Sequence, residues 1–150
     1  MQKQKIQDDL KQAMLAKDEE RLSVIRMLKS AIQYFEIQKG GAGYEATDED
    51  VMDVVGREIK KRRESIEMYK NGNRPELAAK EERELTILQT YLPEQLDEET
   101  VRALVTEAVN QTGATTMQDM GKVMAALMPK VKGKADGNLI SSLVREKLSN

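Results

Sequence analysis

Apolar residues recur at every third or fourth position through most of this chain, which is the spacing of one face of an α-helix. The pattern predicts two helices in the first 40 residues, over residues 2–17 and 19–39. It predicts two longer helices over residues 48–70 and 75–92, and three shorter ones after residue 97. No segment alternates apolar and polar residues as a half-buried strand does. We therefore predict an all-α fold.

Residues that cap or break helices mark the predicted ends. Thr47 followed by Asp50 resembles a capping box with Asp in place of the usual Glu. Pro93 ends the fourth helix, because proline has no backbone N–H to donate. The stretch that Pro93 begins separates long helices from short ones, so we predict two domains. Residues 1–93 form an elongated, hairpin-like helical domain, and residues 94–150 form a compact three-helix bundle.

The chain contains no cysteine and no histidine, while 33% of its residues are charged. Without cysteine there is no disulfide, thiol nucleophile or thiolate metal site. Without histidine, no side chain has an unperturbed pKa near neutrality for general acid–base catalysis. The carboxylates do not have the spacing of a cation-binding loop. We therefore predict no catalytic residue, no metal and no cofactor, and we set aside a self-contained amidotransferase or hydrolase.

The apolar stretches are too short for a membrane span, which needs about 18 or more consecutive apolar residues. The first nine residues, Met1-Gln-Lys-Gln-Lys-Ile-Gln-Asp-Asp9, lack the apolar stretch of a secretory signal peptide. We therefore predict a cytoplasmic protein that does not enter a membrane.

The run Arg57-Glu-Ile-Lys-Lys-Arg-Arg63 carries four basic residues in succession. Such a cluster can bind phosphates. On a helix, however, its side chains point in all directions, and carboxylates lie at the four-residue spacing of intrahelical ion pairs. The pairs are Glu58 with Arg62, Lys60 with Glu64, and Arg63 with Glu67. We favour a solvated, ion-paired face, and a contribution of the run to phosphate binding stays open.

Met117, Met120, Met124 and Met128 also follow helical spacing. An adaptable, methionine-rich face can bind partner helices, but methionine equally fills irregular gaps in small cores. We favour core packing. Gly121 lies inside the same predicted helix, where a glycine costs about 1 kcal/mol relative to alanine. We attribute it to close packing against a neighbouring element.

The C-terminal end is basic in an otherwise acidic chain. Residues 120–150 contain six basic and two acidic side chains, a net charge of +4, whereas residues 1–119 contain 18 basic and 24 acidic ones, a net charge of −6. Lys130, Lys132 and Lys134 stand in one glycine-containing loop, where side chains and backbone N–H groups can both reach a phosphate. Charge alone is a weak indication of nucleic-acid binding, since +4 is far from the basic stripe of a dedicated binder.

The same end resembles the C-terminal module of the GatB/YqeY family. The resemblance rests on Met120-Gly-Lys-Val-Met-Ala-Ala-Leu-Met-Pro-Lys-Val-Lys-Gly-Lys-Ala-Asp-Gly137, followed by Leu139-Ile140 and Leu143-Val144. Stretches of the N-terminal part also look like free-standing YqeY-like proteins, among them Lys11-Gln-Ala-Met14, Lys61-Arg-Arg-Glu-Ser65 and Tyr91-Leu-Pro93. The resemblance therefore covers essentially the whole chain.

The resemblance implies contact with RNA and no chemistry of its own. In the B subunit of the glutamine-dependent tRNA amidotransferase this module is a tail that contacts the body of the tRNA. The carbon–nitrogen ligase activity, with glutamine as amido-N-donor, belongs to portions of that enzyme which this chain lacks. Carried over residue by residue, the resemblance gives as nucleic-acid-binding residues Gly121, Lys122, Lys130, Lys132, Gly133 and Lys134.

Two functions from different classes follow. The first is a non-catalytic cytoplasmic protein that binds tRNA or another structured RNA by its shape and phosphate charge. The alternative is a protein-interaction adaptor that docks on a tRNA amidotransferase or synthetase. The oligomeric state stays open.

Overall fold

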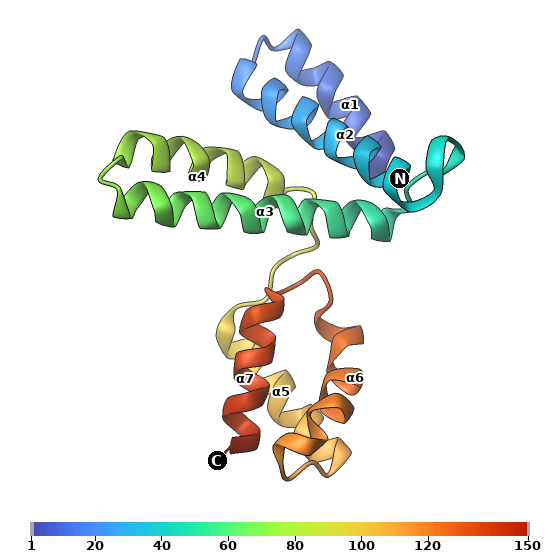
Figure 1. Ribbon diagram of the computed structural model, residues 1–150, viewed down its shortest axis with the longest axis vertical. Coiled ribbons are helices and arrows are strands. Elements are labelled where there is room, and N and C mark those ends of the chain that lie inside the picture. The colour runs from blue at the N-terminus through green and yellow to red at the C-terminus, as the bar shows by residue number, and fades with distance from the viewer. Residues whose placement is uncertain (1, 150) are drawn as a thin grey trace. The chain divides into compact units, whose positions relative to one another are not determined.

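The computed structural model describes residues 2–149 and is all-α in that range, as predicted. It contains seven α-helices and two single-turn 3-10 helices there, without a strand (Figure 1). The α-helices are α1 (Gln2–Leu15), α2 (Glu19–Gly40), α3 (Asp48–Asn71), α4 (Pro75–Gln89), α5 (Glu98–Thr112), α6 (Met120–Val131) and α7 (Gly137–Ser149), and the 3-10 helices are η1 (Gly41–Gly43) and η2 (Met117–Asp119).

The chain divides into two compact units, residues 1–92 and residues 93–150. The division predicted from the sequence falls one residue later, after Pro93. No helix of the described range is long and apolar enough to cross a lipid bilayer.

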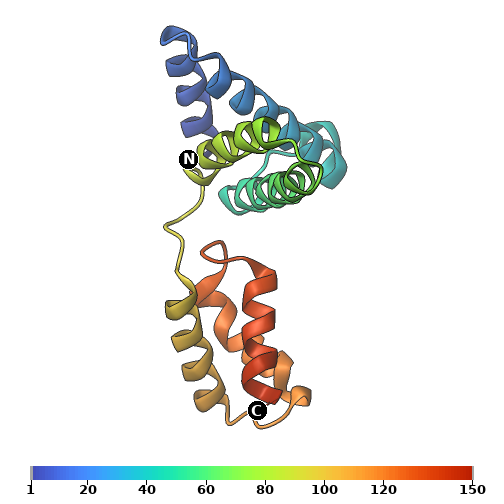
Figure 2. The ribbon, with the colours of Figure 1, turned by 90° about the vertical axis from the view of Figure 1, so that its left-hand side faces the viewer.

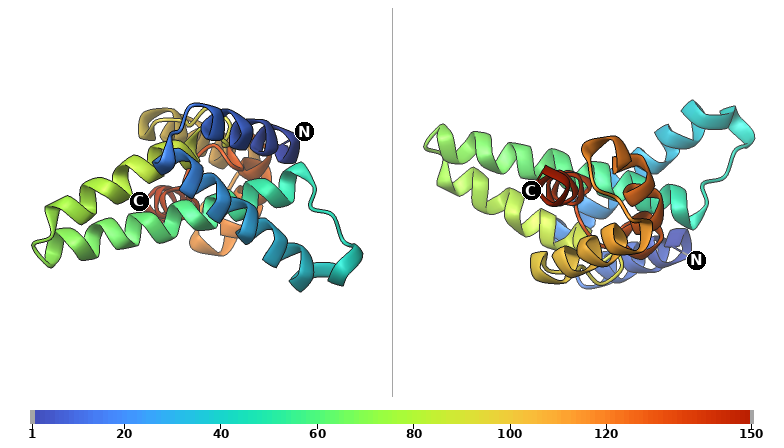
Figure 3. Two further views of the ribbon diagram at one scale, coloured as in Figure 1. Left: turned by 90° about the horizontal axis from the view of Figure 1, so that it is seen from above. Right: turned by 90° about the horizontal axis from the view of Figure 1, so that it is seen from below.

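The first unit consists of two helical hairpins, α1 with α2 and α3 with α4. The distal half of the α3–α4 hairpin extends beyond α1 and α2 (Figures 1 and 3). Local capping fixes where the helices begin: the Asp18 carboxylate accepts from the backbone N–H of Arg21 at 3.1 Å. At the start of α3, the predicted capping box of Thr47 and Asp50 is present in both directions. These caps satisfy backbone N–H groups that have no partner in the first turn of a helix.

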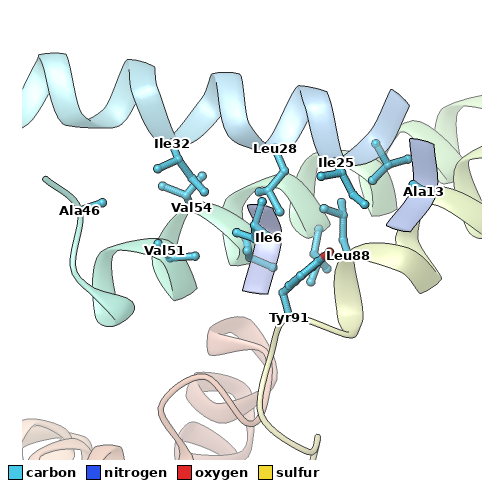
Figure 4. Close-up of a cluster of buried hydrophobic side chains, with 13 residues drawn as sticks. Ile6, Ala13, Ile25, Leu28, Ile32, Ala46, Val51, Val54, Leu88 and Tyr91 are labelled. Carbon is cyan, nitrogen blue, oxygen red and sulfur yellow. The ribbon is translucent and has the colours of Figure 1, made fainter. Parts of the chain in front are cut away.

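All four helices of this unit contribute to one core. Ile6 from α1, Leu28 from α2, Val55 from α3 and Leu88 from α4 are at most 2% exposed, and they meet in one cluster with Tyr91 (Figure 4). Burying each such aliphatic side chain contributes about 1.5–3 kcal/mol. The core therefore holds the two hairpins together.

The second unit is a three-helix bundle in which α5, α6 and α7 all contact one another (Figure 2). Its buried residues are all aliphatic, and those most completely buried include Val101, Val123, Leu127, Val131 and Val144. Because Val123, Leu127 and Val131 recur every four residues, they form a single stripe along α6.

Pro129 lies inside α6, which continues to Val131, because a proline near a helix end removes only one backbone hydrogen bond. Two predictions about this helix need correction. The methionines pack at the margin of the core, which the valine and leucine stripe occupies, and Met117 is 42% exposed. Gly121 is not packed closely, since a Cβ placed there would meet no atom within 4 Å.

Candidate functional site

Lys132 and Lys134 of the predicted lysine loop lie in the turn that joins α6 to α7, whereas Lys130 belongs to the helix. Gly133 adopts a φ of +74°, the left-handed conformation that glycine takes without strain. The side-chain amide of Gln95 donates to the Gly133 carbonyl at 2.9 Å, and the Leu96 N–H donates to the Lys134 carbonyl at 2.8 Å. The loop is therefore fastened by the segment that begins this unit.

The six predicted nucleic-acid-binding residues do not form one cluster. Gly121 and Lys122 lie in the first turn of α6, Lys130 lies in its last turn, and the others follow the helix. At a rise of about 1.5 Å per residue, the first and last turns of α6 are separated by about 14 Å. The residues therefore run along one helix and its following turn.

Part of the predicted positive charge is neutralised inside the unit. The Lys130 ammonium lies 3.2 Å from the Glu107 carboxylate of α5. Two backbone N–H groups, those of Thr115 and Thr116, lower the pKa of Asp119, and the charge of Lys122 adds a smaller effect. Lys132 and Lys134 are exposed. A lysine that pairs with its own chain has to give up that pair before it can bind a phosphate.

The unit as a whole is not basic. The +4 of residues 120–150 is offset by the acidic residues of residues 93–119, which include the first turn of α5. Residues 93–150 contain seven basic and eight acidic side chains, a net charge of −1. The net charge of the unit therefore gives no overall attraction to a polyanion, and such an attraction would have to come from the local arrangement of its lysines.

The basic run at residues 57–63 is partly an ion-paired surface, as favoured from the sequence. Lys61 lies 3.2 Å from Glu58. Arg62, whose side chain is only 14% exposed, lies 3.2 Å from Glu84 and 3.9 Å from Glu58. Lys60 and Arg63 form no ion pair within residues 2–149, so two of the three predicted pairs are absent there.

The clearest shifts in pKa belong to groups that are fixed by neighbours in the first unit. Lys39 at 2.8 Å, Tyr44 at 2.5 Å and the Thr47 N–H at 3.0 Å hold the pKa of the buried Asp50 carboxyl well below its usual range. These contacts tie the segment after α2 to the start of α3. They stabilise the fold, and each of the two carboxylate oxygens accepts at least one hydrogen bond within it.

Tyr91 is the second such group. Its ring is buried in the core, and its hydroxyl donates to Asp9 at 2.7 Å. Burial, followed by the hydrogen bond to Asp9, raises the pKa of the Tyr91 hydroxyl well above its usual value. A phenol held in this way stays protonated and serves packing.

Two concave sites are too small for a typical organic ligand. One, between α1 and α2, has a volume of about 110 Å³, and one between α5 and α7 has a volume of about 230 Å³. Ligand pockets usually have about 300–1,000 Å³. Recognition on an open surface does not need such a pocket.

The outer side of α2 provides such a surface, which the sequence analysis missed. Tyr34 is 67% exposed and Ile37 is 62% exposed. Every exposed residue between Met27 and Gln38 is uncharged, and these residues define what we call the uncharged face of α2: Ser30, Gln33, Tyr34, Ile37 and Gln38.

The charged residues of the same stretch turn away from this face. The Lys29 ammonium donates to the Gln7 side chain of α1 at 2.8 Å. Glu36 accepts from Lys3 at 2.9 Å and from the Ala46 N–H at 2.6 Å. Both contacts lower the pKa of the Glu36 carboxyl, and the hydrogen bond from Lys3 has the larger effect. The signal in the sequence was that Tyr34 and Ile37 do not belong to the apolar stripe of this helix.

Comparison with known proteins gives a family and several relatives. A family model described as Yqey-like protein matches residues 3–148. A protein of Vanderwaltozyma polyspora named "Altered inheritance of mitochondria protein 41, mitochondrial" is 32% identical over 153 residues, covering 97% of this chain and 80% of the relative. A Pyrenophora tritici-repentis protein of the same name is 30% identical, covering 95% of this chain and 78% of the relative. In Saccharomyces cerevisiae a protein of this name is 36% identical over 58% of this chain and 46% of its own length.

These names contradict two predictions. The predicted function, that of a cytoplasmic tRNA-binding protein, and the predicted cytoplasmic location were wrong, because the relatives are named mitochondrial proteins. The prediction of location rested on the lack of a secretory signal and of a membrane span, and neither feature distinguishes the cytoplasm from the interior of an organelle. The partners predicted with that function, a structured RNA and a tRNA amidotransferase or synthetase, stay predictions.

Proposed function

This chain belongs to the Yqey-like protein family, and from that premise we propose that it acts in mitochondria and in their inheritance, as a non-enzymatic protein that binds a protein partner through the uncharged face of α2. The observation that carries the proposal is the exposure of Tyr34 and Ile37 on a face without charge.

We propose a role in the inheritance of mitochondria from the names of the relatives. Two of them align with more than nine-tenths of this chain, and their printed names refer to mitochondria and to altered inheritance of mitochondria. The aligned region includes both units, so the proposal concerns the chain as a whole.

The surface is proposed from its composition. The fully buried centre of a protein–protein interface is depleted of charged residues and enriched in tyrosine. Two large exposed side chains one turn apart, Tyr34 and Ile37, are suited to act as the anchors of such an interface.

The lack of catalysis is proposed from the chain's ionisable groups. Histidine and cysteine do not occur in the sequence. Asp50 and Tyr91, the groups whose pKa departs most from its usual value, are both held by hydrogen bonds within the fold. Perturbed groups of a catalytic site would instead converge on a cleft.

The test is functional replacement in Saccharomyces cerevisiae cells that lack their own relative. This chain, expressed behind a mitochondrial leader peptide, is expected to restore the inheritance of mitochondria by daughter cells. The double variant Tyr34→Ser, Ile37→Ser is expected to lose this activity while keeping the fold, because both side chains are exposed.

A matched control removes two other exposed apolar side chains, Leu15 and Met68, which are 80% and 72% exposed. The variant Leu15→Ser, Met68→Ser is expected to behave as the wild type. Failure of the wild-type chain, at a level of protein equal to that of the native relative, would contradict the proposed process. Full activity of the Tyr34, Ile37 variant would contradict the proposed surface.

A further inference from the structure

We propose that the partner on the uncharged face of α2 is a second copy of this chain, bound through the same face with the two α2 helices antiparallel. The inference rests on the proposed function only in its choice of surface, since self-association can be measured without any cellular assay. It deepens the proposal by naming the partner.

Self-association is favoured first by charge. Two copies of a charged face would place like charges opposite each other, which destabilises a symmetric pair. The stretch from Met27 to Gln38 exposes no charge, because Lys29 and Glu36 are already engaged with Gln7 and Lys3. Within this stretch the face can therefore meet its own copy without placing like charges opposite each other.

The second argument is the arrangement of side chains about Ser30. In an α-helix, residues four positions apart lie on the same side, separated by about 6 Å along the axis. Arg26 lies four residues before Ser30 and Tyr34 lies four residues after it, and all three are exposed. A two-fold axis at Ser30 therefore brings Arg26 of each copy level with Tyr34 of the other.

These two side chains are chemically complementary. An arginine guanidinium stacks on the face of a tyrosine ring in a cation–π contact. Arg26 forms no ion pair within the described range, and Tyr34 is 67% exposed, so both are available. Ser23 and Ile37 each lie seven residues from Ser30, in opposite directions along α2. The same axis therefore places Ile37 of one copy level with Ser23 of the other. Ser30 itself is small, which permits a close approach of the two helices at the axis.

The pair is expected to be weak. Stable interfaces bury about 800 Å² on each partner, and one face of a single helix buries less. We therefore expect a monomer–dimer equilibrium in the micromolar range, detectable by sedimentation velocity as a concentration-dependent increase in mass. Tyr34→Ala is expected to weaken the dimer about tenfold, as the loss of a central aromatic anchor does. Met68→Ala, at an equally exposed position elsewhere, is expected to leave it unchanged.

Single cysteines give the sharpest test, because the chain has none of its own. At a two-fold axis a residue meets its own copy, so Ser30→Cys is expected to form a disulfide-linked dimer under mild oxidation. Ser23→Cys is the matched control: in an antiparallel pair its two copies are separated by about 21 Å, from 14 residues at about 1.5 Å each. A disulfide needs Cα atoms about 4.4–6.8 Å apart, so this variant alone is expected to form no disulfide-linked dimer.

Mixing Ser23→Cys with Ile37→Cys is expected to restore cross-linking, now as a heterodimer. Cross-linking of Ser23→Cys with itself as efficiently as of Ser30→Cys would overturn the antiparallel arrangement. A monomeric mass at every concentration, together with no cross-linking by Ser30→Cys, would overturn self-association. If the Tyr34, Ile37 variant still failed in yeast in that case, the proposed function would stand and the partner would be a different protein.

Discussion

In the unit of residues 1–92 several charged side chains turn inward, whereas in the unit of residues 93–150 they stay at the surface. Both buried charged residues of the described chain, Asp50 and Glu58, belong to the first unit. The buried residues of the second unit are all aliphatic. Each unit nevertheless has a net charge of −1, from 17 basic and 18 acidic residues in the first and from seven and eight in the second.

Because both units have the same net charge, net charge does not show where a binding surface lies. The way in which charged side chains pair does differ between the units, and it is the better guide. In the second unit Lys130 pairs with Glu107, and Arg102 pairs with Glu98 and Glu146, all at the surface. In the first unit the inward turn of Lys29 and Glu36 leaves the outer side of α2 uncharged between Met27 and Gln38. At the place where a basic sequence first suggested a site, Lys130 already pairs with Glu107, and we regard the exposed face without charge as the stronger candidate.

The largest effect is expected from removing an enclosed charge of the first unit. Arg62→Ala leaves the carboxylates of Glu58 and Glu84, whose side chains are 10% and 12% exposed, without their shared cation. Removing one partner of a buried ion pair costs about 3 kcal/mol or more. All four tyrosines lie in residues 1–92, so near-ultraviolet circular dichroism of the intact chain reports the unfolding of this unit.

The control for this variant is Lys60→Ala, which lies in the same basic run but is exposed and unpaired within the described range. Unfolding of the first unit, as followed by the tyrosine signal, is called the tyrosine transition. Lys60→Ala is expected to leave the midpoint of this transition unchanged. Equal losses of stability in the two variants would show that the enclosure of Arg62 does not add to its effect. The two units would then not differ in how much their charged residues contribute to stability.

A smaller effect is expected from the pH dependence of the first unit. The pKa of Asp50 is lowered in the fold, first by Lys39 and then by Tyr44 and Thr47. A lowered pKa stabilises the fold above the pKa of the unfolded chain, about 3.9 for Asp, and this stabilisation is lost as the pH falls through the folded value. Asp50→Asn should therefore destabilise the tyrosine transition at neutral pH, and its difference from the wild type should shrink as the pH falls below about 4. A constant difference down to acid pH would contradict the assigned role of the Asp50 carboxylate.

The smallest effect is expected in the second unit from the exposed triad of Arg102 with Glu98 and Glu146. The Arg102 side chain is 48% exposed. Water and salt screen such pairs, so the change in the stability of this unit in Arg102→Ala should be hard to separate from zero. Because no tyrosine lies in this unit, a loss of the far-ultraviolet circular dichroism signal that occurs without a change in the tyrosine signal reports its unfolding. A loss as large as that of Arg62→Ala would show that the two units do not differ as described.

Much of the fold could be predicted from local patterns. The three-to-four spacing gave the all-α class, because that spacing is the geometry of the helix itself. The capping box of Thr47 and Asp50 was also found, since its two partners lie three residues apart. Features encoded within one turn of a helix are visible in a sequence.

The candidate site could not be predicted, because it depends on contacts between distant residues. Lys130 is neutralised by Glu107, 23 residues away, and no count of charges in a window reveals that pair. Lys29 and Glu36 are drawn away from the outer side of α2 by Gln7 and Lys3 of another helix. Tyr34 and Ile37 then look like scattered apolar residues until the fold places them on one exposed face.

The most direct measurement compares the two surfaces in one assay, the recovery of mitochondrial inheritance in yeast cells that lack their own relative. One variant carries Tyr34→Ser with Ile37→Ser, and the other carries Lys130→Ala with Lys134→Ala. We expect the first variant to fail and the second to work as the wild-type chain does, with both present at equal levels. Failure of the lysine variant together with full activity of the α2 variant would contradict the proposed surface.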